Sequence, residues 1–403
     1  MAENDFDVIV VGARCAGSPT AMLLARKGYK VLLVDRAEFP SDTISTHVVH
    51  PTGVAALDRW GLLDRITASG CPPIDTYTFD FGPFTIAGSP GTAESPVAYA
   101  PRRTVLDKVL VDGASEAGAE VREGFGVEEI VMDDGRVTGI RGKSKDGASV
   151  TERARLVVGA DGLRSLLART VEAEQYNEHP PQLCGYYSYW SGLPTDGRFE
   201  VYDREDRGFA AAATNDDLTM VVGGWPYAEL EANKSDIEGH YLKIFERAPE
   251  FAERLRGATM ETRVLGMAVP NFFRKPFGPG WALVGDAGYN RDFITAQGIS
   301  DAFRDAELCA TAIDATLSDA RPFDEAMGEY QATRDDQVLP MYEFTVQLAS
   351  LQPPPPELQQ LLGAVHGNQD AMDGFARVNA GVTSPAEFFS EENVGRIFAA
   401  ASG

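Results

Sequence analysis

The stretch Asp7–Asp35, DVIVVGARCAGSPTAMLLARKGYKVLLVD, decides how this chain folds. It begins with the uninterrupted apolar run Val8–Val11, which is typical of a parallel strand buried on both faces. The chain then turns at Gly12 and passes through residues that favour a helix. A second apolar run, Val31–Val34, ends on Asp35. The succession of strand, glycine turn, helix, strand and acid predicts a βαβ unit.

The positions of the glycines and the acid predict a dinucleotide site. Gly12 permits a tight turn, and Gly17 lets the helix pack closely against the first strand. The free backbone N–H groups at the start of that helix attract a pyrophosphate, and Asp35 is placed to accept hydrogen bonds from the adenosine ribose. An acid at this position favours an unphosphorylated ribose, as in FAD or NAD. The alternative is an ordinary βαβ unit with a glycine-rich turn.

One position of the turn departs from the usual pattern. Arg14 stands where a middle glycine normally lets the backbone approach the phosphates. We expect its side chain to lie along the phosphates or the adenine side of the cofactor. Ala16 in the same turn and Arg36 directly after the acid are also predicted to bind the cofactor.

Length and composition limit the classes of protein. The chain has 403 residues, of which 44% are hydrophobic, enough for two packed domains. Its net charge of −24 argues against nucleic acid and anionic membrane surfaces as partners. The sequence has no apolar run of about 18 residues and no signal-like start, so we expect no membrane insertion and a cytoplasmic location. The cysteines lack the spacing of a disulfide framework or a metal site.

Two later apolar runs also end in a glycine and an acid. Leu156–Val158 is followed by GADG with Asp161, and Trp281–Val284 is followed by Gly285 and Asp286. Each aspartate has an ordinary explanation as a turn or N-cap residue. Their occurrence together with the N-terminal unit instead favours one shared dinucleotide site.

This set of motifs resembles the flavoprotein monooxygenases with the para-hydroxybenzoate hydroxylase fold, a superfamily that also holds geranylgeranyl reductases and flavin-dependent halogenases. The resemblance covers about residues 5–330 and implies that the dinucleotide is FAD. It implies that Asp161 holds the pyrophosphate region and is linked to NAD(P)H use, and that Asp286, after Gly285, binds the ribityl chain. It also implies that the following helix start, Gly298 and Ile299, lies against the flavin. The pattern R-x-x-L-D starting at Arg103, with Arg102 as the less favoured candidate, implies an arginine near the phosphates.

The expected architecture is α/β, with a Rossmann-like FAD-binding domain interleaved with a mostly antiparallel sheet that binds the substrate. The FAD-binding domain is predicted to comprise residues 1–73, 100–175 and 270–330. The substrate domain comprises 74–99 and 176–269, and 331–403 form a helical C-terminal region. Most aromatic residues of 176–269 are expected in the core, with a minority lining a pocket. His47 and His50 are expected to be loop histidines bonded to the backbone rather than flavin ligands.

Four functions remain open. The first is a monooxygenase that takes NADPH or NADH as transient reductant, reacts with molecular oxygen through a flavin C4a-hydroperoxide, and hydroxylates an apolar, aromatic or polycyclic small molecule. The second is a C=C reductase of the geranylgeranyl reductase type. It is kept open because Phe293 stands where the family commonly has proline. A halogenase is disfavoured, since residues 45–107 hold no lysine and no W-x-W-x-I occurs. A flavoprotein sensor, or an enzyme reduced by a separate flavin reductase, is the last alternative. The sequence does not identify a catalytic base.

Overall fold

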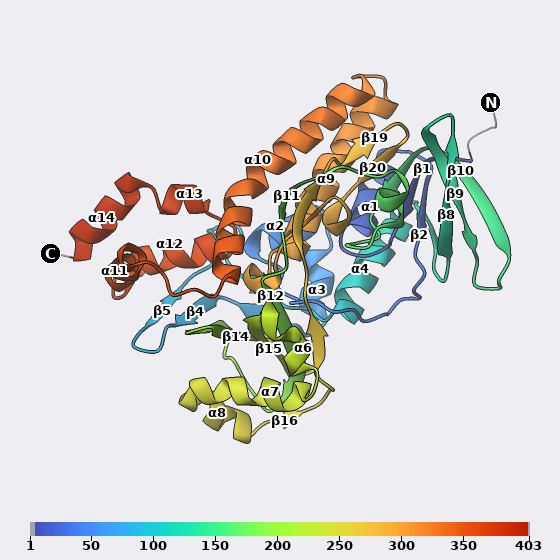
Figure 1. Ribbon diagram of the computed structural model, residues 1–403. Coiled ribbons are helices and arrows are strands. Elements are labelled where there is room, and N and C mark those ends of the chain that lie inside the picture. Colours follow the sequence, from blue (N-terminus) through green and yellow to red (C-terminus); the bar gives the residue numbers. More distant parts are fainter. Residues whose placement is uncertain (1–4, 402–403) are drawn as a thin grey trace.

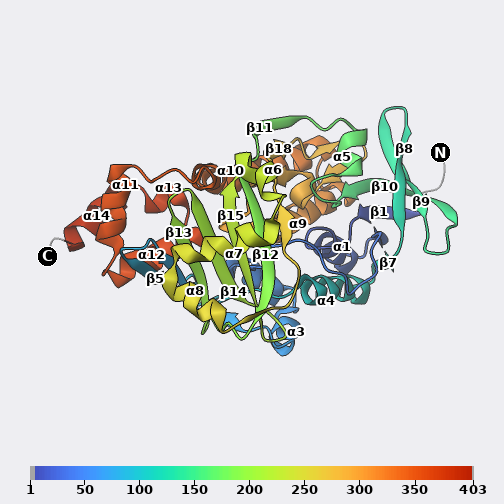
Figure 2. The ribbon, with the colours of Figure 1, turned by 60° about the horizontal axis from the view of Figure 1, so that its bottom comes forward.

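The computed structural model describes residues 5–401, so the first and last residues of the predicted domains and most of the acidic start lie outside the described part. Figures 1 and 2 show an elongated molecule. The mostly parallel sheet that contains the N-terminal βαβ unit lies at one end, a second sheet in the middle, and the C-terminal helices at the other end. No helix within residues 5–401 combines the length and apolar composition needed to cross a membrane.

The first sheet is built on the predicted βαβ unit. Its strands run in the order β19-β20-β10-β1-β2-β7, and all neighbours are parallel except β19 and β20. Their bounds are β1 (Phe6–Val11), β2 (Val31–Val34), β7 (Glu120–Arg122), β10 (Ser149–Gly159), β19 (Phe277–Gly278) and β20 (Trp281–Leu283). The apolar residues of β1 and β2 are all buried, as expected for apolar runs covered on both faces.

Different elements cover the two faces of this sheet. Helices cover one face: α1 (Gly17–Arg26), α2 (Pro51–Arg59), α3 (Leu63–Ala68), α4 (Arg103–Glu116) and α9 (Gly298–Leu317). The other face packs on the hairpin of β8 (Gly126–Asp133) and β9 (Arg136–Lys143) and on α5 (Leu166–Thr170). Gly28, with φ of +91°, follows α1 and ends it in the left-handed conformation that glycine favours.

The second sheet is antiparallel apart from the parallel pair β13 and β4. Its order is β16-β12-β15-β14-β13-β4-β5, with β17 also paired to β12. The bounds are β4 (Thr76–Asp80), β5 (Thr85–Gly88), β12 (Leu183–Ser191), β13 (Arg198–Arg204), β14 (Arg207–Ala213), β15 (Leu218–Pro226), β16 (Thr259–Met260) and β17 (Leu265–Met267). Side chains alternate between its faces, so Tyr186 and Trp190 point outward while Tyr187 and Tyr189 point inward.

Helices cover both faces of the second sheet. Short helices between residues 227 and 256, which the sequence did not lead us to predict, cover the outer face: η1 (Tyr227–Glu229), α6 (Leu230–Asn233), α7 (Ile237–Ile244), η2 (Phe245–Arg247) and α8 (Pro249–Arg256). The C-terminal helices pack against the inner face: α10 (Phe323–Ala349), α11 (Pro356–Val365), α12 (Gln369–Asn379), α13 (Pro385–Phe388) and α14 (Glu391–Ala401). The C-terminal region is therefore part of the second core.

Small elements join the two sheets. One is a three-stranded sheet of β11 (Gln175–His179), β18 (Asn271–Arg274) and β21 (Tyr289–Asn290). Another is the pair β3 (Pro73–Ile74) and β6 (Ala98–Tyr99). The short helices η3 (Gly285–Ala287) and η4 (Phe293–Thr295) lie between β20 and α9, in the loop that the sequence marks as flavin-binding.

Candidate functional site

The glycine–acid turns meet at the carboxyl edge of the first sheet. Val11 at the end of β1 is level with Val34 of β2 and Gly159 of β10, and Gly159 is level with Leu283 of β20. The residues that follow these strand ends therefore leave the sheet side by side. This edge is where open parallel sheets bind their ligands.

The turns are packed too closely for side chains at the glycines. A Cβ at Gly12 or Gly17 would lie closer than 3.0 Å to backbone, at the carbonyl oxygen of Ala160 for Gly12 and of Gly12 for Gly17. Gly12 also has φ of +104°. A Cβ at Gly285 would lie 2.7 Å from Cβ of Ala16. The turn after β1 and the turn after β20 are thus in contact through Ala16 and Gly285, both of which were predicted to bind the cofactor.

Asp35 holds the first turn in place. One carboxylate oxygen accepts a hydrogen bond from the backbone N–H of Ala13 at 2.7 Å, and the other accepts from Ala37 at 2.8 Å. The side chain is half-buried and each oxygen retains a further lone pair, so it can still accept from ribose hydroxyls. Arg36 is exposed and makes no polar contact within residues 5–401.

Arg14 and Arg103 share one buried carboxylate, that of Asp107. Nη1 of Arg14 lies 2.5 Å from Oδ2 of Asp107, and Nη2 of Arg103 lies 2.9 Å from Oδ1. Arg14 also donates to the carbonyl of Ser41 at 3.2 Å, and 25% of its side chain is exposed. It is therefore tied down between the glycine turn and α4, while its place along the phosphates stays a prediction. Asp107 was not predicted, although its i,i+4 spacing from Arg103 was a usable signal.

Asp161 and Asp286 differ in their surroundings. Asp161 accepts from the backbone N–H of Leu166, the first residue of α5, at 2.6 Å, while its Oδ1 has no partner within the described residues. Asp286 accepts no hydrogen bond from any described residue. Its side chain is exposed to solvent, although many protein atoms of the surrounding turns lie close to the carboxyl group. This partial desolvation raises the pKa of Asp286 to about 6, against the opposing charge of Arg103.

The loop from Asp286 to α9 is held by buried arginines that the sequence did not reveal. Arg334 of α10 is fully buried and donates to the carbonyl of Gly288 at 3.1 Å, and Arg274 of β18 donates to that of Ala287 at 2.8 Å. Both lie far from the loop in sequence, so no local pattern could have identified them. At its end, Gly298 is exposed with open space around it and Ile299 is buried. The first residue of α9, Gly298, is therefore accessible, whereas the rest of its first turn is buried.

His47 and His50 lie between this loop and the second sheet. His50 donates from Nε2 to the carbonyl of Thr295 at 3.1 Å and accepts at Nδ1 from the Tyr77 hydroxyl at 2.7 Å. His47, with φ of +65°, bonds the Tyr189 hydroxyl through Nε2. The expectation of backbone partners is thus correct for one nitrogen of His50 and wrong for His47. Burial lowers the pKa of both, to about 4 for His50 and about 3 for His47, so both rings are neutral.

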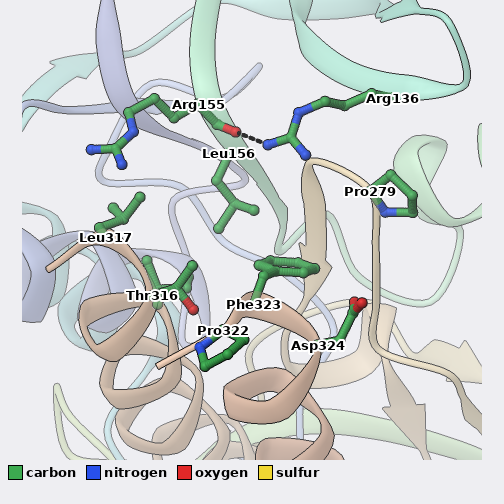
Figure 3. A pocket seen from close by; sticks show the side chains of 10 residues that line it. Arg136, Arg155, Leu156, Pro279, Thr316, Leu317, Pro322, Phe323 and Asp324 are labelled. Carbon is green, nitrogen blue, oxygen red and sulfur yellow. Dashed lines mark hydrogen bonds between the residues drawn. The ribbon is translucent and has the colours of Figure 1, made fainter. Parts of the chain in front are cut away.

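A separate cavity of about 410 Å³ lies away from these turns (Figure 3). It is lined by Leu156, Pro279, Thr316 and Phe323, with Arg136 donating to the carbonyl of Arg155 at its rim. These residues lie at the amino ends of the parallel strands, the edge opposite the glycine turns. The cavity is therefore not part of the candidate site.

Comparison with known proteins decides the family. Residues 5–338 match the family described as FAD binding domain. The chain belongs to this FAD-binding family. Among the curated proteins, the chain is similar to digeranylgeranylglycerophospholipid reductase 1 of Methanopyrus kandleri, with 30% identity over 318 residues, which are 74% of this chain and 77% of the relative. The chain is thus a flavin-dependent oxidoreductase.

Solved structures share the fold over nearly the whole chain. The myxobacterial chondrochloren halogenase CndH superposes with a TM-score of 0.81 at 23% identity, covering 97% of this chain and 99% of that one. PqsL, a probable FAD-dependent monooxygenase from Pseudomonas aeruginosa, gives 0.71 at 21% identity, with 92% and 98% covered. The predicted α/β architecture is therefore confirmed. The predicted superfamily is confirmed by the family match and the reductase relative, while the reaction is not decided by fold.

The residues of the site fit FAD. Gly12 and Gly17 form a bare backbone turn at a helix start, which suits a pyrophosphate. The unpartnered Oδ1 of Asp161 and the solvent-reached carboxylate of Asp286 are acceptors suited to hydroxyl groups. The open start of α9 at Gly298 offers backbone N–H groups. The individual assignments of cofactor-binding residues stay predictions.

Proposed function

We propose that this flavoprotein is a monooxygenase that takes electrons from NADPH or NADH and hydroxylates an apolar, aromatic or polycyclic small molecule. FAD, when bound, supplies the redox chemistry by which one oxygen atom of O₂ reaches the substrate and the other leaves as water. The chain itself supplies binding, orientation and exclusion of water.

The observation that carries this proposal is the inner face of the second sheet where it meets the flavin loop. Tyr187 and Tyr189 of β12 are 1% and 2% exposed, and His47 packs against both rings. Phe293 of the loop lies against Gly185 of the same strand. These aromatic side chains exclude solvent and meet the flavin loop through Phe293, an arrangement that suits an apolar substrate and keeps water from the reacting atoms.

Each part of the chain has a defined task in this proposal. The glycine turns hold the pyrophosphate, Asp286 accepts from the ribityl chain, and the backbone N–H groups at Gly298 stabilise negative charge on the flavin ring. The C-terminal helices close the site from outside, since Nε2 of Gln297 donates to the carbonyl of Asn379 at 2.8 Å. No side chain has yet been assigned as general base.

Anaerobic mixing of the purified holoenzyme with NADH or NADPH tests the proposal. We expect the flavin absorbance to bleach without oxygen. After oxygen is admitted, we expect oxygen consumption to rise only when an aromatic substrate from a small-molecule panel is present, with a product one oxygen atom heavier. Bleaching followed by substrate reduction without oxygen uptake would contradict the proposal. An absence of bleaching with either nucleotide would point instead to a separate flavin reductase.

A C=C reductase is the second candidate, and sequence similarity favours it. The relative at 30% identity is named as a reductase of an isoprenoid lipid. Phe293 also fills space beside the flavin loop where the monooxygenase resemblance leads us to expect proline. The two functions differ in one product measurement: reduction adds two hydrogen atoms to the substrate, whereas hydroxylation adds one oxygen atom.

A further inference from the structure

The cavity at the amino ends of the parallel strands has no role in the proposed function. It lies between the strands β9 and β10 and the connection from α9 to α10 (Figure 3). Its volume of about 410 Å³ falls in the range of small-molecule sites. An apolar cavity of about 150 Å³ holds one benzene molecule, so this one has room for about two fused rings and a small polar group.

The body of this cavity is apolar. Leu156 of β10 and Ile313 of α9 are buried, and the partly buried Leu317 extends the surface that they form. Phe323, the first residue of α10, packs edge-on against Phe277 with ring centroids 6.0 Å apart, so the core fixes its position. Figure 3 shows Leu156 and Phe323 facing each other across the cavity. These side chains suit the apolar part of a ligand.

Arg136 of β9 lies on the side of the cavity away from Phe323 (Figure 3). Its Nη2 donates to the carbonyl of Arg155 at 3.0 Å. The turn between β19 and β20 packs on its alkyl chain, since a Cβ at Gly280 would lie 3.0 Å from Cγ of Arg136. The guanidinium group is therefore held in place, and no carboxylate of residues 5–401 forms an ion pair with it. Its other N–H groups are left for a ligand.

Arg155 adds a second positive charge on the same side (Figure 3). Its Nη1 lies 3.5 Å from Oδ1 of Asp7, and 44% of its side chain is exposed, so this ion pair is loose. Among the described residues that line the cavity, Asp324 is the only acid, so the positive charges outnumber the negative ones. In a chain with a net charge of −24, a local excess of arginines beside an apolar cavity favours a ligand that carries a carboxylate.

We propose that this cavity is a binding site for a small carboxylic acid with an apolar body of about two rings, separate from the flavin site. The carboxylate accepts hydrogen bonds from the guanidinium group of Arg136, which has the planar geometry to donate two in parallel. The rings lie between Leu156 and Phe323. The bound acid thus joins β9 and β10 of the first sheet to the start of α10, and so it stabilises the folded chain.

The test titrates the purified holoenzyme by calorimetry with 2-naphthoate and with 2-naphthylmethanol, a neutral analogue of similar shape. We expect the acid to bind about tenfold or more tightly than the alcohol and to raise the melting temperature. Arg136→Gln should weaken naphthoate binding by about tenfold or more and remove the preference for the acid. Thr316→Trp places an indole ring in the cavity from α9 and should abolish binding of both probes. Leu317→Trp fills the same space and replaces Thr316→Trp if that variant does not fold.

The matched control is Arg141→Gln on the same strand. Arg141 is exposed, pairs with Glu129 and does not line the cavity, so its loss changes the net charge equally and should leave naphthoate binding unchanged. The proposal is wrong if wild type does not bind naphthoate at about 1 mM, if the alcohol binds equally well, or if both glutamine variants lose the same affinity. Retained binding in the tryptophan variant would also overturn it, because naphthoate would then occupy another site.

Discussion

The carboxylate of Asp286 should make FAD affinity depend on pH. Its pKa is raised to about 6 because nearby protein partly desolvates the carboxyl group, so the side chain is mostly ionised at pH 7 and mostly protonated at pH 5. Hydroxyl groups of the ribityl chain donate more strongly to an ionised acceptor than to a neutral one. We therefore expect FAD to bind preferentially to the ionised form, and affinity to fall as the pH drops through 6.

The size of the effect follows from hydrogen-bond strengths. A hydrogen bond to a charged group contributes about 1.5–3 kcal/mol and one between neutral groups about 0.5–1.5 kcal/mol. Losing the charge in Asp286→Asn should thus weaken FAD binding by roughly 1–1.5 kcal/mol, about fivefold to tenfold. Losing the acceptor altogether in Asp286→Ala should weaken it by about tenfold to a hundredfold.

The assay is titration of the deflavinated protein with FAD, followed by flavin fluorescence, at several pH values between 5 and 8. Wild type should lose up to about tenfold in affinity between pH 7 and pH 5, whereas Asp286→Asn should show a flat profile over this range. Equal pH slopes for wild type and Asp286→Asn would refute the assignment, as would full FAD affinity in Asp286→Ala.

Three further substitutions test the packing around the site. Gly17→Ala places a methyl group on the carbonyl oxygen of Gly12, so we expect loss of FAD from the purified protein and a lower melting temperature. Normal FAD content would contradict the prediction that this turn binds FAD. Asp107→Asn leaves two arginines without their buried partner and should destabilise by about 3–5 kcal/mol in urea unfolding, an effect that an exposed pair would not give. Tyr77→Phe removes the donor to Nδ1 of His50 and should cost about 1–3 kcal/mol by the same measurement; an unchanged midpoint would mean that this buried bond is dispensable.

The sequence predicted those parts of the site in which the chemistry is local. Gly12, Gly17 and Asp35 belong to one short segment, and only glycine fits where the backbones approach so closely. The turns that carry Asp161 and Asp286 could also be predicted locally, because each follows a buried strand in the sequence. Apolar runs and turn residues are read along the chain, so this part of the fold required no knowledge of distant contacts.

The sequence failed where a residue acts through a partner far along the chain. Asp107 pairs with Arg14 across 93 residues, and Tyr189 bonds His47 across 142. Arg334 reaches the loop of Gly288 from a helix that resembles an ordinary surface helix in sequence. The helices of residues 230–256 were missed because their apolar residues serve a sheet face that exists only in the folded protein.

By itself, therefore, the sequence determined a dinucleotide site and the edge of the sheet at which it is expected, since those follow from glycines and acids at strand ends; that the dinucleotide is FAD was implied by the family resemblance. Only the tertiary structure decided what faces that edge. Strand register aligned Gly185, Gly224 and Gly208 into one row and brought Phe293 onto it. Register is fixed by pairing between distant strands, and a slip of one residue would send every one of these positions to the other face.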